Sequence, residues 1–518
     1  MRAVYRVADV RAAEESLMAT LPPDLLMRRA AAGLARRCAL LLGAQGGVYG
    51  ARVLLLVGAG NNGGDALFAG ARLARRGAAV QALLLEPERV HAAGLAELHA
   101  AGGGTVDQLP ECVDLVVDGI VGIGGLGGLR PPADRIAARL AGLRDRAGHR
   151  ATVVAVDMPS GIAADTGGLP EEPAGRPGER TAAVTADVTV TFGCLKPALV
   201  VGPAAPLAGQ VELVDIGLGP WLQRATPALR VTEGSDVADW WPRLPPTTDK
   251  YVRGVVGLAT GSATYPGAAV LSVAGALAGP AGMVRYAGGA AAEVLHRYPE
   301  VIATDRAAEA GRVQAWVCGS GLGTGDEALT ELRCVLAAPV PVVLDADALT
   351  LLVDGSSATD LRRRTAPIVI TPHDREFARL AGEAPGTDRV GAALRLAAWM
   401  NAVVLLKGDR TVVATPDGRA YANSTGTAAL ATGGTGDVLA GLLGSLLAAG
   451  LPAERAALAA AYLHGLAGRE AAQHGPVTAS DVAVALRQVI ARLLAAGPEE
   501  SGPASSGWEV RRGDHPGK

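Results

Sequence analysis

Short apolar runs alternate with longer amphipathic stretches over the first half of the chain. The runs that we expect to form strands buried on both faces of a parallel sheet are Arg52–Val57, Val80–Leu85, Leu115–Asp118 and Val153–Asp157. The helical patterns between them include Ala66–Arg76 and Arg135–Arg144. A last β-rich part covers Asp187–Phe192 and Val211–Asp215. Because strands and helices alternate, the pattern predicts a doubly wound, Rossmann-like α/β sandwich.

The second half of the chain repeats this alternation and predicts a second α/β domain. Its expected strands are Val255–Ala259, Ala315–Gly319, Val342–Asp345, Ile368–Thr371 and Val403–Lys407. The segment Lys407–Thr411 leads directly into Thr411–Thr415, which predicts a hairpin.

The composition changes between Gly219 and Pro246, where tryptophans and prolines flank a polar stretch. We therefore expect a first domain over residues 1–222, a linker over 223–246 and a second domain over 247–496. Residues 497–518 are rich in Gly, Ser, Pro and charged side chains, which is typical of a disordered tail.

Composition narrows the classes of protein to consider. A chain of 518 residues is too long for one ordinary core, and its net charge of −3 gives no field for a polyanion, so we expect no nucleic-acid partner. The five cysteines form no CxxC pair and the eight histidines show no HExxH spacing. No apolar signal-peptide core follows Met1, and the longest apolar run, Val438–Leu451, is too short to cross a bilayer. These features predict a cytoplasmic protein that does not engage a membrane.

Two glycine-rich segments, each ending in an aspartate, lie far apart in the chain, at Val57–Asp65 and Ala431–Asp437. Each resembles the turn between a strand and a helix N-terminus, where free backbone N–H groups attract phosphate. A tight structural turn is the alternative for the first segment, and a plain helix cap is the alternative for the second. Two such segments predict two catalytic domains that act on phosphorylated ligands.

Polar residues at other strand ends strengthen the prediction for the first half. Asp118 ends one expected strand, Asp157 and Ser160 follow the next, and Lys196 lies in the last β-rich part. The carboxyl ends of parallel strands meet at one crevice, where such folds bind ligands. Asn62, Asp118 and Ser160 offer only oxygen ligands, which suits a hard cation. For Lys196 a solvated loop lysine is the alternative.

Four motifs of the first half match those of the NAD(P)H-hydrate epimerases in order, over roughly residues 1 to 220. They are Gly60–Asp65, Asp118–Gly124, Val156–Gly161 and Phe192–Pro197. The resemblance implies that potassium is held by Asn62, Asp118 and Ser160, and that Asp157 and Lys196 are the acid/base pair that equilibrates the epimers of hydrated nicotinamide. The residues that it implies for binding the dinucleotide substrate are Asn61, Asn62, Gly63, Gly64, Asp65, Gly122, Ile123, Gly124, Gly125, Leu126, Gly127, Gly128 and Asp157. One departure is Arg28, where the family commonly has an acidic residue.

In the second half Asp437 begins an expected helix, Val438 to about Ala449, behind a run of glycines. Backbone N–H groups and the positive helix end would form an anion hole for a transferring phosphoryl group, and Asp437 could accept a proton from a substrate hydroxyl. Lys407–Thr411 presents a cation and a hydroxyl suited to nucleotide phosphates. His373 could hold a substrate ring, although a structural role is the alternative. Asp345 and Asp347 would point to opposite sides only if their strand persists.

This half, from about Asp249 to Leu494, resembles the ADP/ATP-dependent NAD(P)H-hydrate dehydratases of the ribokinase-like superfamily. The matching elements are Tyr265–Ala269, Gly319–Gly323, Leu344–Leu349, Thr371–His373, Lys407–Thr411 and Gly433–Gly441. The resemblance implies that the hydrated nucleotide is contacted by Ala268, Gly323, His373 and Asp437. It implies that the adenine nucleotide is contacted by Lys407, Gly408, Asp409, Arg410, Thr411 and Gly436. Ser320 departs from the family, which often has proline there.

Together the two resemblances predict a bifunctional repair enzyme that epimerises the R and S forms of hydrated NADH or NADPH and then dehydrates the S form. The expected co-substrate is ADP, leaving AMP and phosphate, with magnesium and potassium as ions and a homo-oligomer as the assembly. Two alternatives stay open: a ribokinase-like small-molecule kinase, and an N-terminal half that binds nucleotides without catalysis.

Overall fold

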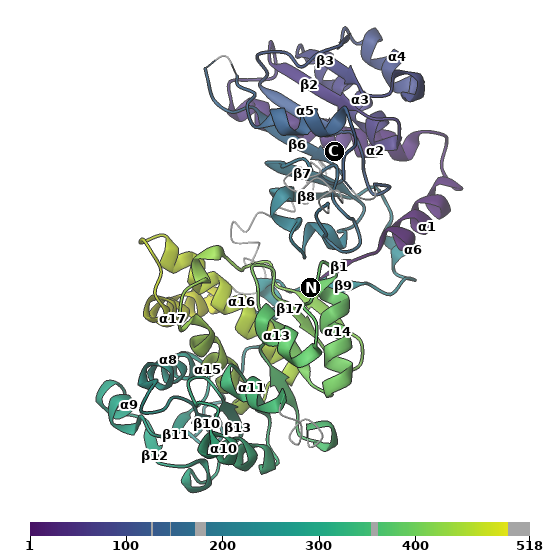
Figure 1. Cartoon of the computed structure of the whole chain (residues 1–518). Helices are drawn as coiled ribbons and strands as arrows, with labels where there is room; N and C mark the ends of the chain where they lie inside the picture. The colour runs from purple at the N-terminus through teal and green to yellow at the C-terminus, as the bar shows by residue number, and fades with distance from the viewer. Residues whose placement is uncertain (126–127, 146, 171–182, 354–360, 496–518) are drawn as a thin grey trace. The chain divides into compact units, whose positions relative to one another are not determined.

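The computed structural model describes residues 1–125, 128–145, 147–170, 183–353 and 361–495. These residues form two compact units, which are described separately (Figure 1). The N-terminal unit contains Ala3–Ala228, and the C-terminal unit contains Met1–Arg2 together with the described residues from Leu229 onward. Leu126 and Gly127 of the expected substrate loop, and the expected tail 497–518, lie outside the described residues.

The N-terminal unit is built on a seven-stranded parallel sheet in the order β4-β3-β2-β5-β6-β7-β8. Its strands are β2 (Arg52–Val57), β3 (Ala79–Leu84), β4 (Gly104–Val106), β5 (Leu115–Gly119), β6 (Thr152–Val156), β7 (Val188–Phe192) and β8 (Gln210–Val214). Its helices of eight residues or more are α1 (Val7–Met18), α2 (Leu25–Ala44), α3 (Asn61–Ala74), α4 (Ala92–Ala100) and α5 (Ala133–Leu140), and the short α6 is Gly219–Leu222. The strand order reverses between β2 and β5, so a crevice opens there at the carboxyl ends of the strands.

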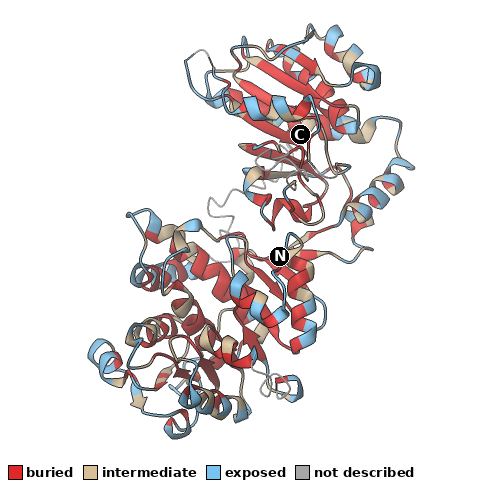
Figure 2. Cartoon of the chain, in the orientation of Figure 1, coloured by how far each residue is buried: buried red, intermediate tan, exposed pale blue. Residues whose placement is uncertain are grey.

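Alternate side chains of the same strands fill two apolar layers. Leu55 and Val117 pack in one core with α2 and α3, whereas Leu54 and Val116 pack in the other with α5. The strands are buried and the outward helix faces are exposed (Figure 2). Burial on both faces explains why the strands read as continuous apolar runs. The predicted doubly wound sandwich is confirmed.

The C-terminal unit contains a mixed eleven-stranded sheet in the order β1-β9-β18-β17-β16-β15-β14-β13-β10-β11-β12. The strands are β1 (Arg2–Val4), β9 (Leu229–Val231), β10 (Val255–Ala259), β11 (Met283–Ala287), β12 (Ile302–Thr304), β13 (Ala315–Cys318), β14 (Val342–Leu344), β15 (Ile368–Ile370), β16 (Val403–Leu406), β17 (Val412–Ala414) and β18 (Ala420–Ala422). The pairings β16–β17 and β17–β18 are antiparallel, and the first of them is the hairpin expected from the sequence. The strand order reverses between the parallel neighbours β10 and β13, and folds of this kind bind ligands at the carboxyl ends of the strands at such a point.

The helices of this unit are α7 (Gly234–Trp240), α8 (Pro266–Ala278), α9 (Ala291–Arg297), α10 (Asp326–Ala337), α11 (Asp347–Val353), α13 (Asp374–Ala381), α14 (Arg389–Met400), α15 (Thr435–Ala448), α16 (Ala453–Ala472) and α17 (Ala479–Ala495). α15 is buried along almost its whole length and packs on α8, β10 and β13. The range 223–246, expected to be a linker, contains β9 and α7, and both belong to the C-terminal unit. No described helix has the length and apolarity needed to span a bilayer.

Candidate active sites

The first candidate site lies at the ends of β2 and β5 in the N-terminal unit. A Cβ built on Gly58 would lie 1.9 Å from the carbonyl oxygen of Ile120, and one built on Gly63 would lie 2.3 Å from that of Gly58. Only glycine permits these close backbone approaches, so the turn after β2 can press against the loop after β5. The glycines of the first motif thus bring two strand-end loops together.

The glycine-rich segment that ends at Asp65 was expected to precede a helix, but its residues from Asn61 onward form the first turn of α3. α3 begins at Asn61, whereas the apolar pattern placed its start at Ala66. Asn62 and Asp65 are each 9% exposed, and Asn62 Nδ2 and Asp65 Oδ1 are buried without a hydrogen-bond partner among the described residues. Because unpaired buried polar atoms are costly, two of them at one helix N-terminus mark the place where a polar ligand fits.

Asp118 and Ser160 meet in the crevice, as predicted. Ser160 Oγ donates to Asp118 Oδ1 at 2.6 Å and Ser160 N donates to Asp118 Oδ2 at 2.8 Å. Ser160 Oγ also lies 3.1 Å from the carbonyl oxygen of Val121. Burial raises the pKa of Asp118 to about 6, against hydrogen bonds from Ser160 and Ile120 that lower it. A Cβ built on Gly122 would lie 2.9 Å from Asn62 Oδ1, so the third expected oxygen borders the same loop.

Asp157 and Lys196 form a buried ion pair. Lys196, only 1% exposed, donates from Nζ to Asp157 Oδ1 at 2.5 Å, to Thr191 Oγ1 at 3.0 Å and to the Phe192 carbonyl at 2.9 Å. Burial alone lowers the pKa of Lys196, but the nearby Asp157 carboxylate and the other groups facing it raise the pKa above its ordinary value. The alternative of a solvated loop lysine is therefore wrong.

The backbone conformation of Asp157 is unusual. Its φ is 63°, in the left-handed region that residues other than glycine rarely adopt. Its side chain also accepts hydrogen bonds from Thr191 Oγ1 at 3.0 Å and the Phe192 N–H at 3.1 Å. A strained residue that is held by three donors in a ligand crevice is typical of a functional site.

Sequence reasoning missed the contribution of α1 to this site. A Cβ built on Gly124 would lie 3.2 Å from Arg11 Nη2, so Arg11 borders the expected substrate loop. Glu14 follows one helical turn later, and its carboxyl interacts electrostatically with Lys196 and Asp157. The sequence signal for this contribution was the spacing of Arg11 and Glu14, which places both charges on one face of α1. Arg28, the noted departure, forms a 3.1 Å ion pair with Glu97 and lies over the Phe68 ring.

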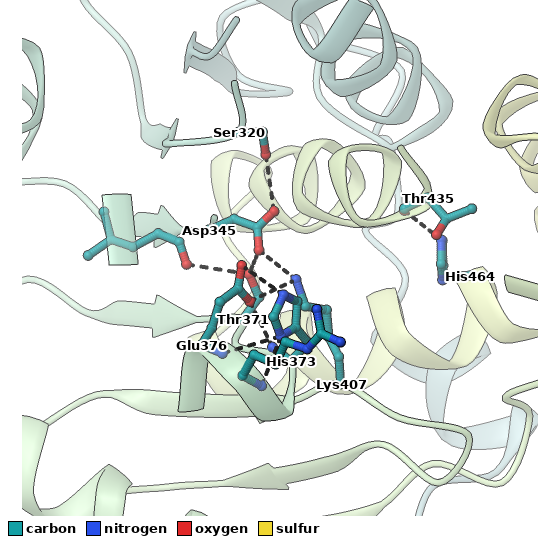
Figure 3. Close-up of polar contacts among 10 residues, drawn as sticks. Ser320, Asp345, Thr371, His373, Glu376, Lys407, Thr435 and His464 are labelled. Carbon is teal, nitrogen blue, oxygen red and sulfur yellow. Dashed lines mark hydrogen bonds and ion pairs between the residues drawn. The ribbon is translucent and has the colours of Figure 1, made fainter. Parts of the chain in front are cut away.

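The second candidate site gathers a lysine and several carboxylates at the ends of β13, β14, β15 and β16 (Figure 3). Lys407 Nζ donates to Asp345 Oδ1 at 2.8 Å and lies 3.6 Å from Glu376 Oε2. Asp345, 2% exposed, also accepts from Thr371 Oγ1 at 2.7 Å and from Ser320 Oγ at 3.1 Å. The hydroxyl of Ser320 thus supplies a hydrogen bond that a proline at this position could not. Burial lowers the pKa of Lys407, but Asp345 and Glu376 raise it above its ordinary value.

The strand before Asp345 ends at Leu344. Asp345 and Asp347 therefore do not alternate between the two faces of a strand. Ala346 has a φ of 50°, and α11 begins at Asp347. Asp347 Oδ2 accepts a hydrogen bond from Gly323 N at 2.9 Å. This contact fixes one of the glycines expected to touch the hydrated nucleotide.

His373 caps the N-terminus of α13. Its Nδ1 accepts hydrogen bonds from the backbone N–H groups of Arg375 and Glu376, and its Nε2 lies 3.5 Å from Glu376 Oε1. The side chain is 49% exposed, so it combines a structural role with an accessible ring. Glu376, which sequence reasoning did not single out, lies between this cap and Lys407 (Figure 3). Its position three residues after His373 in a capping box was the signal.

Asp437 lies in the first turn of α15, which begins at Thr435. Burial and the neighbouring Asp345 carboxylate raise the pKa of Asp437 to about 7, although Ser320 and Lys407 lower it. A Cβ built on Gly436 would lie 3.6 Å from Lys407 Nζ, so the glycine segment borders the lysine–carboxylate cluster. The structure therefore brings the helix N-terminus, Asp437 and Lys407 together, as an anion hole with an adjacent base requires.

The remaining predicted residues of this unit lie beside the Gly319–Gly323 loop or within the segment Lys407–Thr411. Ala268 lies against the Gly319–Gly323 loop, because a Cβ built on Gly321 would lie 2.7 Å from its Cβ. Within Lys407–Thr411, Arg410 donates to the Ser424 carbonyl at 3.1 Å and lies 3.4 Å from Asp409, while Thr411 donates to the Gly408 carbonyl at 3.0 Å. The hydrogen bond of Thr411 thus stabilises the hairpin turn and that of Arg410 joins the turn to Ser424, whereas Lys407 enters the cluster.

Two matches to family models cover most of both units. The model described as YjeF-related protein N-terminus matches residues 23–198, and the model described as NAD(P)H-hydrate dehydratase matches residues 256–490. The bifunctional NAD(P)H-hydrate repair enzyme Nnr of Mycobacterium tuberculosis is 49% identical over 458 residues, which cover 88% of this chain and 91% of that protein. The enzyme of the same name from Mycobacterium leprae is 46% identical over 499 residues, covering 96% and 99%.

Among solved structures, the ADP/ATP-dependent NAD(P)H-hydrate dehydratase from Bacillus subtilis, co-crystallised with ATP and Mg²⁺, is 28% identical. The match covers 51% of this chain and 99% of that chain, with a TM-score of 0.46.

Two α/β units, each with an ion pair and a glycine-bordered helix N-terminus at its strand ends, define a two-centre enzyme of nucleotide chemistry. The chain belongs to the family of bifunctional NAD(P)H-hydrate repair enzymes. The expected order, an epimerase followed by a dehydratase, is confirmed by this membership. The alternatives of a small-molecule kinase and of a merely nucleotide-binding N-terminal half are not supported.

Proposed function

We propose that the chain restores NADH and NADPH from their hydrated forms in two reactions, each carried out by the named residues of one unit. The N-terminal unit interconverts the R and S epimers, and the C-terminal unit converts the S epimer to the reduced dinucleotide at the expense of ADP. The observation that carries the proposal is the lysine–aspartate pair at the strand ends of each unit, buried at 2.5 Å for Lys196–Asp157 and partly buried at 2.8 Å for Lys407–Asp345.

In the N-terminal unit, the substrate contacts would come from residues 61–65 and 122–128, of which 126 and 127 are not described. Asp157 and Lys196 would handle protons at the hydrated ring, because a paired carboxylate and ammonium can move a proton in either direction. The unpaired Asn62 Nδ2 and Asp65 Oδ1 support a polar ligand there.

The oxygens of Asp118, Ser160 and Asn62 fit a potassium ion, since Asp118 and Ser160 already meet and Asn62 borders the same loop. When bound, potassium would supply a positive charge in the crevice.

In the C-terminal unit, Ala268, Gly323, His373 and Asp437 would contact the hydrated ring. Asp437 would accept the proton of the ring hydroxyl while that oxygen bonds to the terminal phosphorus of ADP and the bond to AMP breaks. Phosphate would then leave with the carbon–oxygen bonding pair, and loss of a proton from the adjacent carbon would restore the double bond. The products are the reduced dinucleotide, AMP, phosphate and a proton.

Residues 407–411 and Gly436 would bind the adenine nucleotide, with Lys407 as the cation nearest to Asp437. Lys407 would share its charge with Asp345 and Glu376, which hold its ammonium in place. Among the described residues no group of three or more His, Cys, Asp or Glu side chains is arranged to hold a metal ion. A magnesium ion would therefore be held mainly by nucleotide phosphates, which would carry its charge to the transferring group.

The test uses the purified chain with separately prepared R and S hydrates of NADH, magnesium and either ADP or ATP. The expected result is that the S hydrate gives NADH with one AMP and one phosphate per turnover of ADP. Conversion without nucleotide consumption, or a phosphorylated dinucleotide that accumulates as the final product, would contradict the proposal. Parallel reactions with ATP distinguish the preferred nucleotide by the product, ADP or AMP.

A further inference from the structure

Asp65 is an unpaired carboxyl in the N-terminal crevice. It lies in the first turns of α3, is 9% exposed, and its Oδ1 is buried with no hydrogen-bond partner among the described residues. The adjacent Gly64 packs against apolar Met27, since a Cβ built on Gly64 would lie 2.9 Å from Met27 Sδ. An ionised carboxylate whose Oδ1 is buried without a donor is costly unless the group keeps its proton or a ligand supplies the donor.

The neighbouring charges favour the same protonated state. Burial raises the pKa of Asp65 well above its ordinary value, and the carboxylates of Asp157 and Glu14 raise it further. Asp157, in contrast, accepts hydrogen bonds from Lys196, Thr191 and the Phe192 N–H at one oxygen. The crevice thus contains one carboxyl group that is held by three donors and one whose Oδ1 has no donor among the described residues.

Epimerisation of a hydrated nicotinamide needs both roles. The hydroxyl sits on a carbon bonded to the ring nitrogen, so it can leave only if its oxygen receives a proton. We propose that Asp65 is the proton donor to this hydroxyl. This inference rests on the proposed epimerase function.

The step balances without a further reagent. Asp65 gives its proton to the hydroxyl oxygen, the carbon–oxygen bond breaks, water leaves, and the nitrogen lone pair forms a carbon–nitrogen double bond. A water then bonds to the opposite face of that carbon, the π pair returns to nitrogen, and the excess proton goes to Asp157. Proton exchange with solvent restores the starting state, and the reverse course begins from the other epimer.

The charged and titratable groups at this end of the unit come from several elements. They are Arg11 and Glu14 on α1, Arg28 on α2 with its partner Glu97 on α4, His91 before α4, Asp118 on β5, Asp157 after β6 and Lys196 after β7. Asp157 and Glu14 are the two carboxylates that raise the pKa of Asp65, so the state of Asp65 depends on Glu14 more than on the surface charges.

The experiment measures epimer interconversion by chromatography at several pH values, without nucleotide and with the uncatalysed rate subtracted. Asp65→Asn should lower kcat by about 10²–10⁴-fold with KM little changed, because the amide keeps the shape but cannot give up a proton. Glu14→Gln should move the alkaline limb of the pH profile to lower pH, because loss of its charge lowers the pKa of Asp65. The matched control, Glu15→Gln, changes an exposed charge at the next position of α1 and should leave the profile unchanged.

Failure of this inference is distinct from failure of the proposed function. If the wild-type chain does not exceed the uncatalysed rate, the epimerase function itself is wrong. If the wild-type chain epimerises but Asp65→Asn stays within about threefold of it, or Glu14→Gln leaves the alkaline limb in place, Asp65 is not the acid. The dehydratase rate of each variant, carried by the other unit, shows that the chain is intact, and the Glu14→Gln profile decides the question should Asp65→Asn disturb folding.

Discussion

At the scale of single residues, both candidate sites use the same physical device. A carboxylate at a strand end is held by a lysine, and a second carboxyl nearby has a raised pKa. In the C-terminal unit the held carboxylate is Asp345 and the second is Asp437; in the N-terminal unit they are Asp157 and Asp65. In both proposals the second carboxyl moves a proton, Asp437 as a base and Asp65 as an acid.

The pKa of Asp437, raised to about 7, gives a prediction for pH dependence. A base must be ionised to act, so kcat/KM of the dehydratase should rise with pH up to about 7 and level off above it. A profile that is flat or falls over this range would contradict the role of Asp437 as the base. Asp437→Asn should abolish the reaction at every pH.

The same shift predicts a change in stability. Because the folded state raises the pKa of Asp437, it favours the proton, and this contribution is complete below the ordinary aspartate value and is lost as pH rises through about 7. Asp437→Asn, which cannot ionise, should therefore be more stable than the wild-type chain at pH 8.5, with the difference vanishing toward pH 4. Denaturant unfolding at the two pH values measures it.

A site residue can be predicted from the sequence when it lies next to a recognisable strand or helix, and not when only tertiary packing brings it to the site. Asp118, Asp157 and Lys196 follow apolar strands directly, so their convergence could be predicted from parallel topology. Glu14 is separated from the crevice by a helix and a long stretch of chain, and its arrival there depends on tertiary packing. Glu376 was hidden for another reason, since a capping box explains it without reference to the site.

At the scale of elements, helix starts were the features least visible in the pattern. The apolar periodicity begins at Ala66 and Val438, whereas α3 and α15 begin at Asn61 and Thr435. Glycines and polar residues carry no hydrophobic signal, yet they form these first turns. In α3 the carbonyl of Gly58 leaves room only for glycine at position 63, and before α15 Gly434 has a φ of 86°. The strands β9, β11 and β12 were missed as well, because Arg230, Arg285 and Thr304 interrupt their apolar runs, whereas the equally short β14 and β15 are apolar throughout.

The packing of α8 on α15 gives a prediction at this scale. A Cβ on Gly275 of α8 would lie 2.1 Å from the Val438 carbonyl oxygen of α15, and one on Gly441 would lie 1.9 Å from the Ser272 carbonyl oxygen. Gly275→Ala should therefore separate the helices and destabilise them by about 1–3 kcal/mol. Hydrogen exchange of α8 and α15 peptides, followed by mass spectrometry, measures the opening free energy.

Gly267→Ala is the matched control on the same helix. A Cβ on Gly267 meets no described atom within 4 Å, so the substitution should leave the opening free energy unchanged or raise it by up to about 1 kcal/mol through helix propensity. Equal effects of the two substitutions would show that close helix contact does not depend on glycine at 275.

At the scale of the whole molecule, the chain combines two units with separate crevices. Met1 and Arg2 belong to the C-terminal unit, where the N-terminal amino group pairs with Asp236 at 2.7 Å and Arg2 pairs with Glu233 at 2.6 Å. A sequence pattern could not reveal this, because it requires the first residues to join a sheet formed more than 200 residues later. The expectation of a homo-oligomer stays a prediction.

The central claim is that two separable reactions lie in one chain, and a comparison of single-site variants tests it most directly. An equal mixture of R and S hydrates of NADH, with ADP and magnesium, is followed by chromatography for the wild-type chain, Asp157→Asn and Asp437→Asn. Asp157→Asn should consume the S epimer at the wild-type rate and the R epimer only as fast as it epimerises unaided. Asp437→Asn should form no NADH but keep the two epimers in exchange, and mixing the variants should restore full conversion. Consumption of both epimers by Asp157→Asn at the wild-type rate, or formation of NADH by Asp437→Asn, would contradict the account.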